Sequence, residues 1–322
     1  MSYLIRPNTK PVLLGGGQDL LRWIDSGGPV DRHLALQRLR QGWAAFWFER
    51  HAEITARQCT TITLPTKMVF IVGLWRSGST VLHRLLTDAT GWATPRTWQC
   101  FRPADFLLAP APRPRQESRP MDEGVVGTFT PQEDEFAALL IGEKSLYRAF
   151  IDPRRLDELT DLLYQWKSLD PAAPPLSGRW EIFLKAVSQG TPGPLLLKSP
   201  NHTFRLPWLA SRFPEAQFVW LTRPKKDVLP SNWRMWSAMI QRYGLWQAEA
   251  RFLERFIENA IKSHDEIFES AQATLSERIH VVTYDEVMGA DSSVVSRLLD
   301  ELDGRPVNGS APSCSPPGLP VV

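Results

Sequence analysis

The apolar positions along the chain follow two alternating patterns. Four short runs of branched and aromatic residues, each bounded by turn residues, are typical of buried strands in a parallel sheet. They lie at residues 69–72, 195–198, 218–221 and 280–283. Between them, apolar residues recur at helical spacing. Strands that alternate with helices predict an α/β fold, with a central parallel sheet and helices on both of its faces.

Helices are expected over most of the remaining chain. They are placed at residues 80–89, 153–168, 178–189, 203–212, 228–242, 245–272 and 285–302. A further helix is expected at 30–54, where the apolar positions form one stripe made of Leu36, Leu39, Trp43, Phe46 and Trp47. The stripe predicts that this helix packs its aromatic face against the core. Replacing Trp43 or Trp47 is therefore expected to affect stability alone.

The chain divides into three segments by composition. Residues 1–60 form an N-terminal helical segment, and residues 61–305 form the main domain. Within that domain, the stretch 92–130 is rich in proline and arginine and has no regular pattern. A loop of this length in a compact domain is usually functional, so we expect it to be a flap over the site. Residues 306–322 are rich in Pro, Gly and Ser and are expected to be a flexible tail.

A loop suited to anions follows the first strand directly. Residues 73–80 read Gly-Leu-Trp-Arg-Ser-Gly-Ser-Thr, and a helix is expected immediately after them. Backbone N–H groups at such a turn point to one spot, where the helix dipole also favours negative charge. The spacing is that of a P-loop, except that Ser79 stands where the P-loop has lysine. The later strands also lack an aspartate that could hold Mg²⁺. The loop thus favours a phosphate-like group without the chemistry of a kinase.

Charge and cysteine content narrow the class of protein. The 322 residues carry a formal net charge of only +2, which does not favour nucleic-acid binding. The cysteines, Cys59, Cys100 and Cys314, are widely spaced and form no zinc pattern, so a reducing cytoplasm is expected. No apolar run is long enough to span a bilayer.

Two more motifs place basic and polar residues at strand ends. Residues 218–231 read FVWLTRPKKDVLPS, so Arg223 follows a strand and Ser231 lies near the start of the next helix. The planar guanidinium suits a phosphate group, and a helix start favours an anion. Pro230 fits only if it lies in the first turn of that helix. The other motif is Leu-Lys-Ser-Pro-Asn-His at 197–202, which places Lys198 at a strand end and His202 beyond it.

These three motifs, in this order, resemble the sulfotransferases that use 3′-phosphoadenosine 5′-phosphosulfate (PAPS), in the bacterial and carbohydrate-type branch. The resemblance covers about residues 66 to 300. It implies a P-loop-like sulfotransferase fold for the main domain and PAPS as the donor, with no metal required. The implied 5′-phosphosulfate contacts are Arg76, Ser77, Gly78, Ser79 and Thr80, and the implied 3′-phosphate contacts are Arg223 and Ser231. The family's C-terminal Arg-Lys-Gly segment has no clear counterpart, since Gly304-Arg305 is a poor substitute.

The same resemblance suggests the catalytic residues. Sulfuryl transfer builds charge on the leaving oxygen, so Arg76 and Lys198 are expected to stabilise it. A general base must take the acceptor's proton. The candidates are His202 and the acidic pair Asp134 and Glu135, with His202 slightly favoured. Glu133 is expected to be used in a capping box with Thr130 at a helix start.

The acceptor is expected to be a small molecule, a lipid or a glycan with a hydroxyl or amine. Residues expected to line its pocket are Trp98, Phe101, Glu133, Asp134, Trp233, Trp236 and Trp246. Related enzymes are often dimers, so a homodimer stays open, and no nucleic-acid partner is expected. Two alternatives remain at this point. One is a P-loop kinase or NTPase with a displaced lysine, and the other is a non-catalytic protein that binds anions on the same fold.

Overall fold

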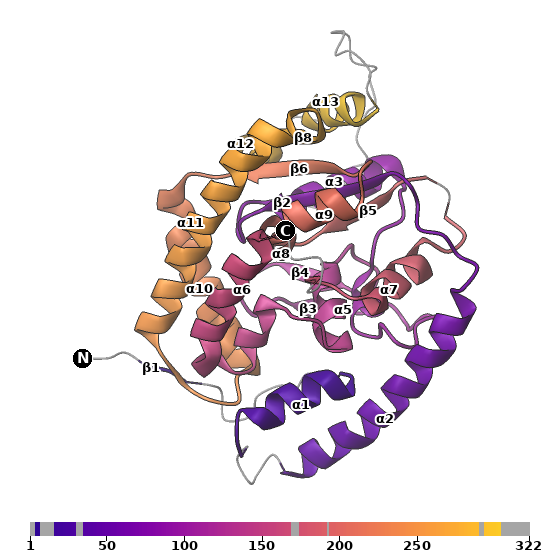
Figure 1. Ribbon diagram of the computed structural model, residues 1–322, viewed down its shortest axis with the longest axis vertical. Helices are drawn as coiled ribbons and strands as arrows, with labels where there is room; N and C mark the ends of the chain where they lie inside the picture. Colours follow the sequence, from indigo (N-terminus) through magenta and orange to yellow (C-terminus); the bar gives the residue numbers. More distant parts are fainter. Residues whose placement is uncertain are drawn as a thin grey trace.

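A computed structural model describes residues 4–6, 16–29, 35–168, 174–191, 193–289 and 293–303, and of 35–38 only the helical backbone (Figure 1). A four-stranded parallel sheet lies at its centre, in the order β5-β2-β6-β8. The strands are β2 (Met68–Gly73), β5 (Leu195–Lys198), β6 (Gln217–Thr222) and β8 (Ile279–Thr283). All four strands expected from the sequence are thus confirmed.

The central strands are held by burial on both faces. Every residue of β2 and β5 is buried, as continuous runs of Val, Ile, Leu and Phe dictate. In the register, Phe70 of β2 lies opposite Leu197 of β5 and Phe218 of β6. Because the strands are parallel, their carboxyl ends, among them Gly73 and Lys198, meet at one edge of the sheet.

Helices cover both faces of the sheet, which confirms the expected α/β class. One face packs on α3 (Ser79–Thr90), α12 (Tyr284–Met288) and α13 (Ser293–Leu302) through a cluster that includes Leu82 and Leu298. The larger core lies on the other face (Figure 1). Its helices are α5 (Asp134–Ile141), α6 (Leu156–Lys167), α7 (Gly178–Ser188), α8 (Pro200–Phe204), α9 (Leu206–Arg212), α10 (Lys225–Tyr243) and α11 (Ala250–Thr274).

Several helix boundaries differ from those expected. The helix expected at 203–212 is two helices, because the chain breaks at Arg205 between α8 and α9. Helix α10 begins at Lys225, so Pro230 lies inside it rather than in its first turn, and that prediction is wrong. The remaining short elements are α1 (Gln18–Ser26), α4 (Thr97–Cys100), the strands β1 (Leu4–Ile5) and β7 (Ala248–Glu249), and the 3-10 helices Leu146–Phe150, Pro153–Arg155 and Ser276–Arg278.

The flap is more ordered than its sequence indicates. It begins with α4 and continues into a hairpin of β3 (Gln116–Ser118) and β4 (Val125–Gly127), with Glu117 opposite Val126. The expected capping box after it is wrong. Helix α5 begins at Asp134 with Glu133 as its N-cap, and no side chain caps it. The Thr130 hydroxyl instead bonds to the backbone of Gly127, so the Glu133 side chain is free for another role.

Helix α2 (Ala35–Gln58) lies along the lower right edge of the molecule in Figure 1. The prediction that its aromatic stripe packs against the core is wrong. Trp43 is 73% exposed and Trp47 is 54% exposed, whereas Ala45 and Thr55 are buried. The side that carries Ala45, Phe48 and Thr55 faces the protein, and the side that carries Trp43 and Trp47 faces outward. No helix in the described ranges is long and apolar enough to cross a membrane.

Candidate active site

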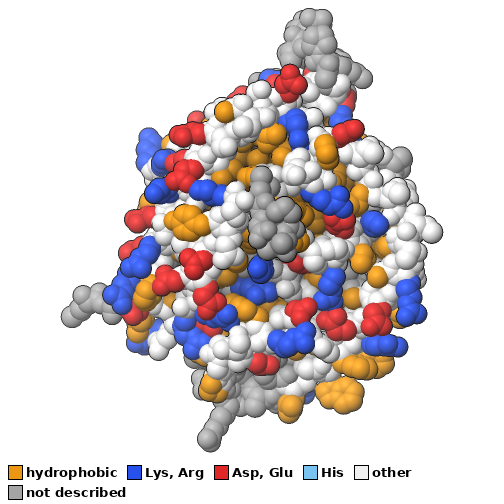
Figure 2. Space-filling view, viewed as in Figure 1, with side chains coloured by type: hydrophobic (Ala, Val, Ile, Leu, Met, Phe, Trp, Pro, Cys, Tyr) orange, Lys and Arg blue, Asp and Glu red, His pale blue; other side chains and the backbone are white. Residues whose placement is uncertain are grey.

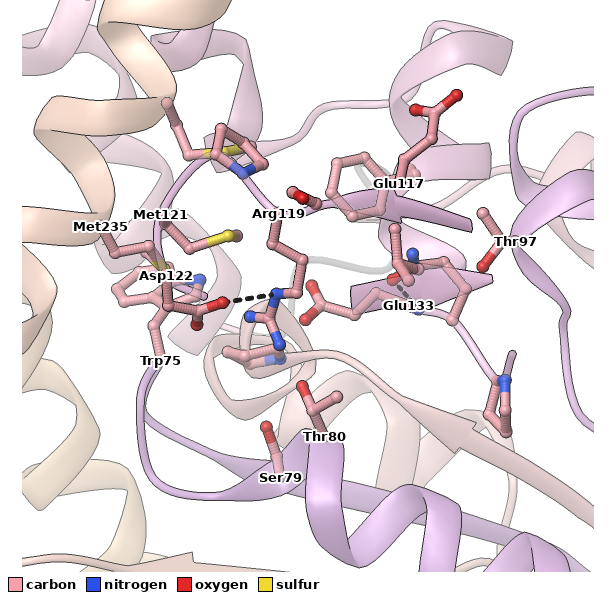
Figure 3. Close-up of a pocket in the computed structure, with 18 of the residues that line it drawn as sticks. Trp75, Ser79, Thr80, Thr97, Glu117, Arg119, Met121, Asp122, Glu133 and Met235 are labelled. Atoms are coloured by element: carbon pink, nitrogen blue, oxygen red, sulfur yellow. Dashed lines mark hydrogen bonds and ion pairs between the residues drawn. The ribbon is translucent and has the colours of Figure 1, made fainter. Parts of the chain in front are cut away.

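A cavity of about 640 Å³ lies at the carboxyl edge of the sheet. The loop after β2 forms one wall, the flap hairpin lies across it, and α10 closes another side (Figure 3). The residues that line it include Arg76, Gly78, Ser79, Thr80, Trp98, Phe101, Arg119, Asp122, Glu133, Tyr147, Arg223, Met235 and Met239. Cations, hydroxyls and apolar side chains thus converge in one place.

The loop after β2 is held in a conformation that few residues adopt. Gly73 and Gly78 have φ values of 132° and 93°, and Arg76 has φ 68° although it is not glycine. A Cβ at Gly73 would lie 2.6 Å from the Leu221 carbonyl oxygen, so a side chain there would force the strands apart. The Thr203 hydroxyl donates to the Gly73 carbonyl at 2.9 Å and accepts from its N–H at 2.8 Å. The loop is therefore shaped in advance, with strain of the kind that collects at functional sites.

The arginines expected to bind phosphate meet at this loop. Arg223 donates to the Arg76 carbonyl oxygen at 2.8 Å, and its guanidinium lies 3.9 Å from the centre of the Tyr284 ring. Arg76 donates through Nε to the Ser231 hydroxyl at 3.1 Å. The structure thus brings Arg76, Arg223 and Ser231 together, although Ser231 lies behind Arg76 and does not line the cavity.

A carboxylate of the flap already contacts these cations. Asp122 accepts from Arg76 Nη1 at 2.7 Å, and its other oxygen lies 3.3 Å from Arg119 Nε. Burial opposes the charge on Asp122, but the hydrogen bond from Arg76 and the charge of Arg119 outweigh it and lower its pKa. Figure 3 shows Arg119 extending between Asp122 and Glu133, above Thr80. The hairpin therefore places an anion where the loop can bind one.

Several polar groups here still lack partners among the residues described. The Ser77 hydroxyl and Arg223 Nε are buried without a hydrogen bond, as are Trp75 Nε1 and Arg84 Nε of the cavity wall. Buried groups of this kind are rare unless a ligand satisfies them. Together with the N-terminus of α3, they fit a ligand that carries phosphate or sulfate oxygens.

Lys198 is buried beside the loop and does not itself line the cavity. Its side chain is 2% exposed, and Nζ lies 2.5 Å from Glu133 Oε1 and 3.4 Å from the Thr80 hydroxyl. The Tyr147 hydroxyl donates to the other oxygen of Glu133 at 2.5 Å. Burial lowers the pKa of Lys198, although the negative charge of Glu133 partly offsets this effect. Burial and the neighbouring charge of Glu133 raise the pKa of Tyr147 well above its ordinary value. Glu133 is thus an oriented carboxylate that borders both the loop and the cavity.

The residues expected to act as the base lie elsewhere. His202 is fully buried, with Nε2 2.9 Å from Asp134, and Asp134 also accepts from the Trp180 indole at 2.9 Å. Glu135 is fully buried in a bidentate pair with Arg205, at 2.5 and 3.0 Å. Neither His202 nor Glu135 lines the cavity. Each is held by a buried partner away from the cavity, so this geometry does not favour either as the base.

The expected acceptor residues divide in the same way. Trp98, Phe101 and Glu133 line the cavity, whereas Trp233, Trp246 and the buried pair Asp134 and Trp236 do not. Trp236 is fully buried, with its ring centre 4.7 Å from that of Phe150, and Trp246 lies under the Arg154 guanidinium. Helix α10 turns Met235 and Met239 toward the cavity instead. Their spacing of four residues places them on one face of the helix and is the sequence signal for this wall.

The known proteins that this chain resembles are sulfotransferases. The family model described as "Sulfotransferase family" matches residues 68–306. The omega-hydroxy-beta-dihydromenaquinone-9 sulfotransferases Stf3 of Mycobacterium tuberculosis and Mycobacterium bovis are each 27% identical over 259 residues. That alignment covers 77% of this chain but only 66% of the length of each relative.

Solved structures show the same fold. Sulfotransferase STF9 of Mycobacterium avium aligns with a TM-score of 0.61 at 17% identity, over 91% of this chain and 84% of its own. Sulfotransferase STF1 of M. tuberculosis aligns with a TM-score of 0.57 at 17% identity, over 90% of this chain and 82% of its own. The expected sulfotransferase fold is confirmed. Since the family model matches well over half of the residues, the chain belongs to the sulfotransferase family.

Proposed function

We propose that the protein transfers the sulfuryl group of PAPS to a hydroxyl group of a lipid or another apolar acceptor. One observation carries the proposal: a buried cation, Lys198, contacts the loop at Thr80 and pairs with an oriented carboxylate, Glu133, which borders the partly apolar cavity. Family membership supports PAPS as the donor. The M. tuberculosis relative is named for action on a menaquinone derivative, which supports a lipid-like acceptor.

The donor would lie along the loop. Backbone N–H groups of residues 77–80 and the Ser79 and Thr80 hydroxyls would hold the 5′-phosphosulfate, with Arg76 as the nearby cation. Arg223 and Ser231 would hold the 3′-phosphate, as the sequence motif implies. Arg119 of the flap would add a cation over the loop in place of the missing Arg-Lys-Gly segment. Residues 304–305, considered for that segment, lie outside the described residues.

The reaction would need little rearrangement of this site. The acceptor oxygen forms a bond to sulfur while the bond from sulfur to the bridging phosphate oxygen breaks, and the acceptor's proton passes to Glu133. Lys198, whose Nζ lies 3.4 Å from the Thr80 hydroxyl of the loop, would stabilise the charge left on the bridging oxygen. Glu133 replaces His202 and Glu135 as the proposed base, because it alone of the three borders the cavity. The end of β5 and the start of α5 are then positioned by the buried residues His202, Asp134, Glu135 and Arg205.

The apolar wall favours an acceptor with hydrocarbon or ring character. Trp98, Phe101, Met235 and Met239 offer flat and adaptable surfaces, and the two methionines suit a flexible chain. Four expectations stay predictions: a cytoplasmic location, independence of metal, the absence of a nucleic-acid partner, and a homodimer.

Ligand binding gives the first test. Adenosine 3′,5′-bisphosphate should raise the melting temperature, because a ligand that binds only the folded protein stabilises it. ATP with Mg²⁺ serves as the comparison for the kinase alternative. A larger shift with ATP and Mg²⁺ than with the bisphosphate would contradict the proposal. A bisphosphate shift without transfer to any acceptor would favour the non-catalytic alternative.

Replacing Asp122 with asparagine should strengthen binding of the bisphosphate. The Asp122 carboxylate competes with the ligand for Arg76 and Arg119, so its removal should lower the dissociation constant, by roughly two- to fivefold as for partly exposed pairs. Isothermal titration calorimetry measures the change. Asp105→Asn is the matched control, since Asp105 also pairs with a nearby arginine and is similarly exposed, but lies outside the cavity. Weaker binding by Asp122→Asn would show that this carboxylate supports the ligand instead.

A further inference from the structure

Helix α2 carries an apolar face that nothing in the described structure covers. Its exposed side chains are Leu39 at 68%, Trp43 at 73%, Phe46 at 50%, Trp47 at 54% and Ile54 at 45%. Figure 2 shows hydrophobic side chains protruding over this helix at the lower right of the molecule. Single exposed apolar residues are ordinary, but a continuous stripe with two tryptophans marks a surface that binds something.

The outward direction of this stripe is fixed by contacts on the other side of α2. Ala45 is buried, and the Thr55 hydroxyl donates to the Ala104 carbonyl oxygen at 2.7 Å. Glu49 accepts from Arg179 of α7 at 2.6 Å and from the Gln18 N–H of α1 at 2.9 Å. Rotating the helix to bury the tryptophans would break all of these contacts. The aromatic face is therefore held toward the outside.

Basic residues continue the same face. Arg50 follows Phe46 by four residues, and Arg57 follows Ile54 by three, so both project on the side of the stripe. Arg40 is exposed one residue after Leu39. Arg50 pairs with Glu53, whereas no acidic partner among the described residues contacts Arg57. Tryptophan, phenylalanine and arginine on one helix face are the side chains that settle at the boundary of an anionic bilayer.

The size of the stripe fits a lipid surface better than a second copy of the chain. Five side chains exposed to this degree present on the order of 500 Å² of apolar area, judged from the area of large side chains. A stable dimer needs about 800 Å² from each partner, spread over 20–30 residues. The stripe is a single helix wide, and arginine continues it. In a helix that lies in the headgroup region, Trp, Phe and Leu side chains enter the bilayer boundary while arginines are attracted to anionic lipids.

We propose that α2 docks the protein on the surface of anionic membranes. The purpose of docking rests on the proposed function, in which the acceptor is a lipid. The docking itself is independent of that function. Helix α2 is tied to the segment that follows Phe101, through Thr55 and Ala104 and through His51, which lies 3.8 Å from Asp105. Since Trp98 and Phe101 line the cavity, docking would hold that wall of the cavity close to the bilayer.

Vesicle sedimentation of the full chain tests the proposal. Vesicles of phosphatidylcholine with phosphatidylglycerol should bind the protein, and vesicles of phosphatidylcholine alone should bind it more weakly. The double variant Trp43→Ala, Trp47→Ala should lower the vesicle affinity at least tenfold with an unchanged melting temperature, because both side chains are exposed. Raised salt should weaken the part of the vesicle affinity that depends on phosphatidylglycerol, because salt screens charge interactions. Tyr164→Ala is the control, since Tyr164 is an aromatic residue of α6 with 45% exposure, and its binding should match the wild type.

Three results would overturn the proposal. The first is a wild type that does not bind mixed vesicles, and the second is a double variant that binds them as well as the wild type. The third is a dimer in sedimentation velocity that depends on Trp43 and Trp47, with no binding to vesicles. The thermal shift with adenosine 3′,5′-bisphosphate is measured on every variant. A normal shift without vesicle binding contradicts docking alone, whereas vesicle binding without any shift contradicts the proposed function alone.

Discussion

Replacing Lys198 with alanine should reduce the rate of sulfuryl transfer by about 10²–10³, or about 2.7–4 kcal/mol, the range for one lost electrostatic stabiliser. The ammonium group is buried between Glu133 and Thr80, where water cannot replace it. Binding of adenosine 3′,5′-bisphosphate should change much less, since Arg76, Arg223 and the loop remain. Single-turnover kinetics with saturating PAPS measure the chemical step separately from binding.

Lys198→Met separates the charge from packing. Methionine fills most of the same space without the charge, so it should lose transfer as alanine does, whereas Lys198→Arg should keep part of the rate. Because burial lowers the pKa of Lys198, the wild-type rate should fall on the alkaline side before lysine's ordinary pKa is reached. Full activity of Lys198→Met with normal bisphosphate binding would remove Lys198 from the mechanism.

Replacing Glu133 with glutamine should reduce transfer by about 10²–10⁴, the usual contribution of a positioned general base. Glutamine has the same shape. Its carbonyl oxygen can accept from Lys198 and its amide N–H can donate to the Tyr147 hydroxyl, so the fold and bisphosphate binding should be preserved. What it lacks is the ability to take a proton. The loss is measured as kcat/KM with an aliphatic alcohol acceptor.

Two comparisons distinguish a base from a residue that only positions others. With a phenol, which releases its proton more readily, the loss in Glu133→Gln should be smaller than with the alcohol. Glu117→Gln, which removes another carboxylate that lines the cavity, should leave transfer close to the wild type. Equal losses for both acceptors would mean that Glu133 acts through Lys198 and is not itself the base.

The local sequence pattern was sufficient to predict the sheet and the loop after β2. The strands are short, continuous and apolar, and the glycines of the loop mark backbone positions that other residues disfavour. Arg76, Arg223 and Lys198 follow strand ends, and parallel strands bring those ends to one edge. The positions of these cations therefore follow from their place in the sequence alone.

Side-chain direction on helices did not follow from the sequence. Glu133, Asp134 and Glu135 are consecutive, but α5 begins between the first and the second, so each points differently. Only Glu133 reaches the cavity, and helix starts are the least predictable part of a helix. Helix α2 shows the same difficulty, because an apolar stripe indicates a face of the helix but not what that face meets.

Transfer of labelled sulfate tests the central claim most directly. The wild type and Lys198→Met are incubated with PAPS that carries a radiolabelled sulfuryl group and with a series of long-chain alcohols and phenols. The account predicts labelled product in the organic phase with the wild type, and little with Lys198→Met although it still binds the bisphosphate. A wild type that binds the bisphosphate but labels no acceptor, or a Lys198→Met variant that labels as well as the wild type, would contradict it.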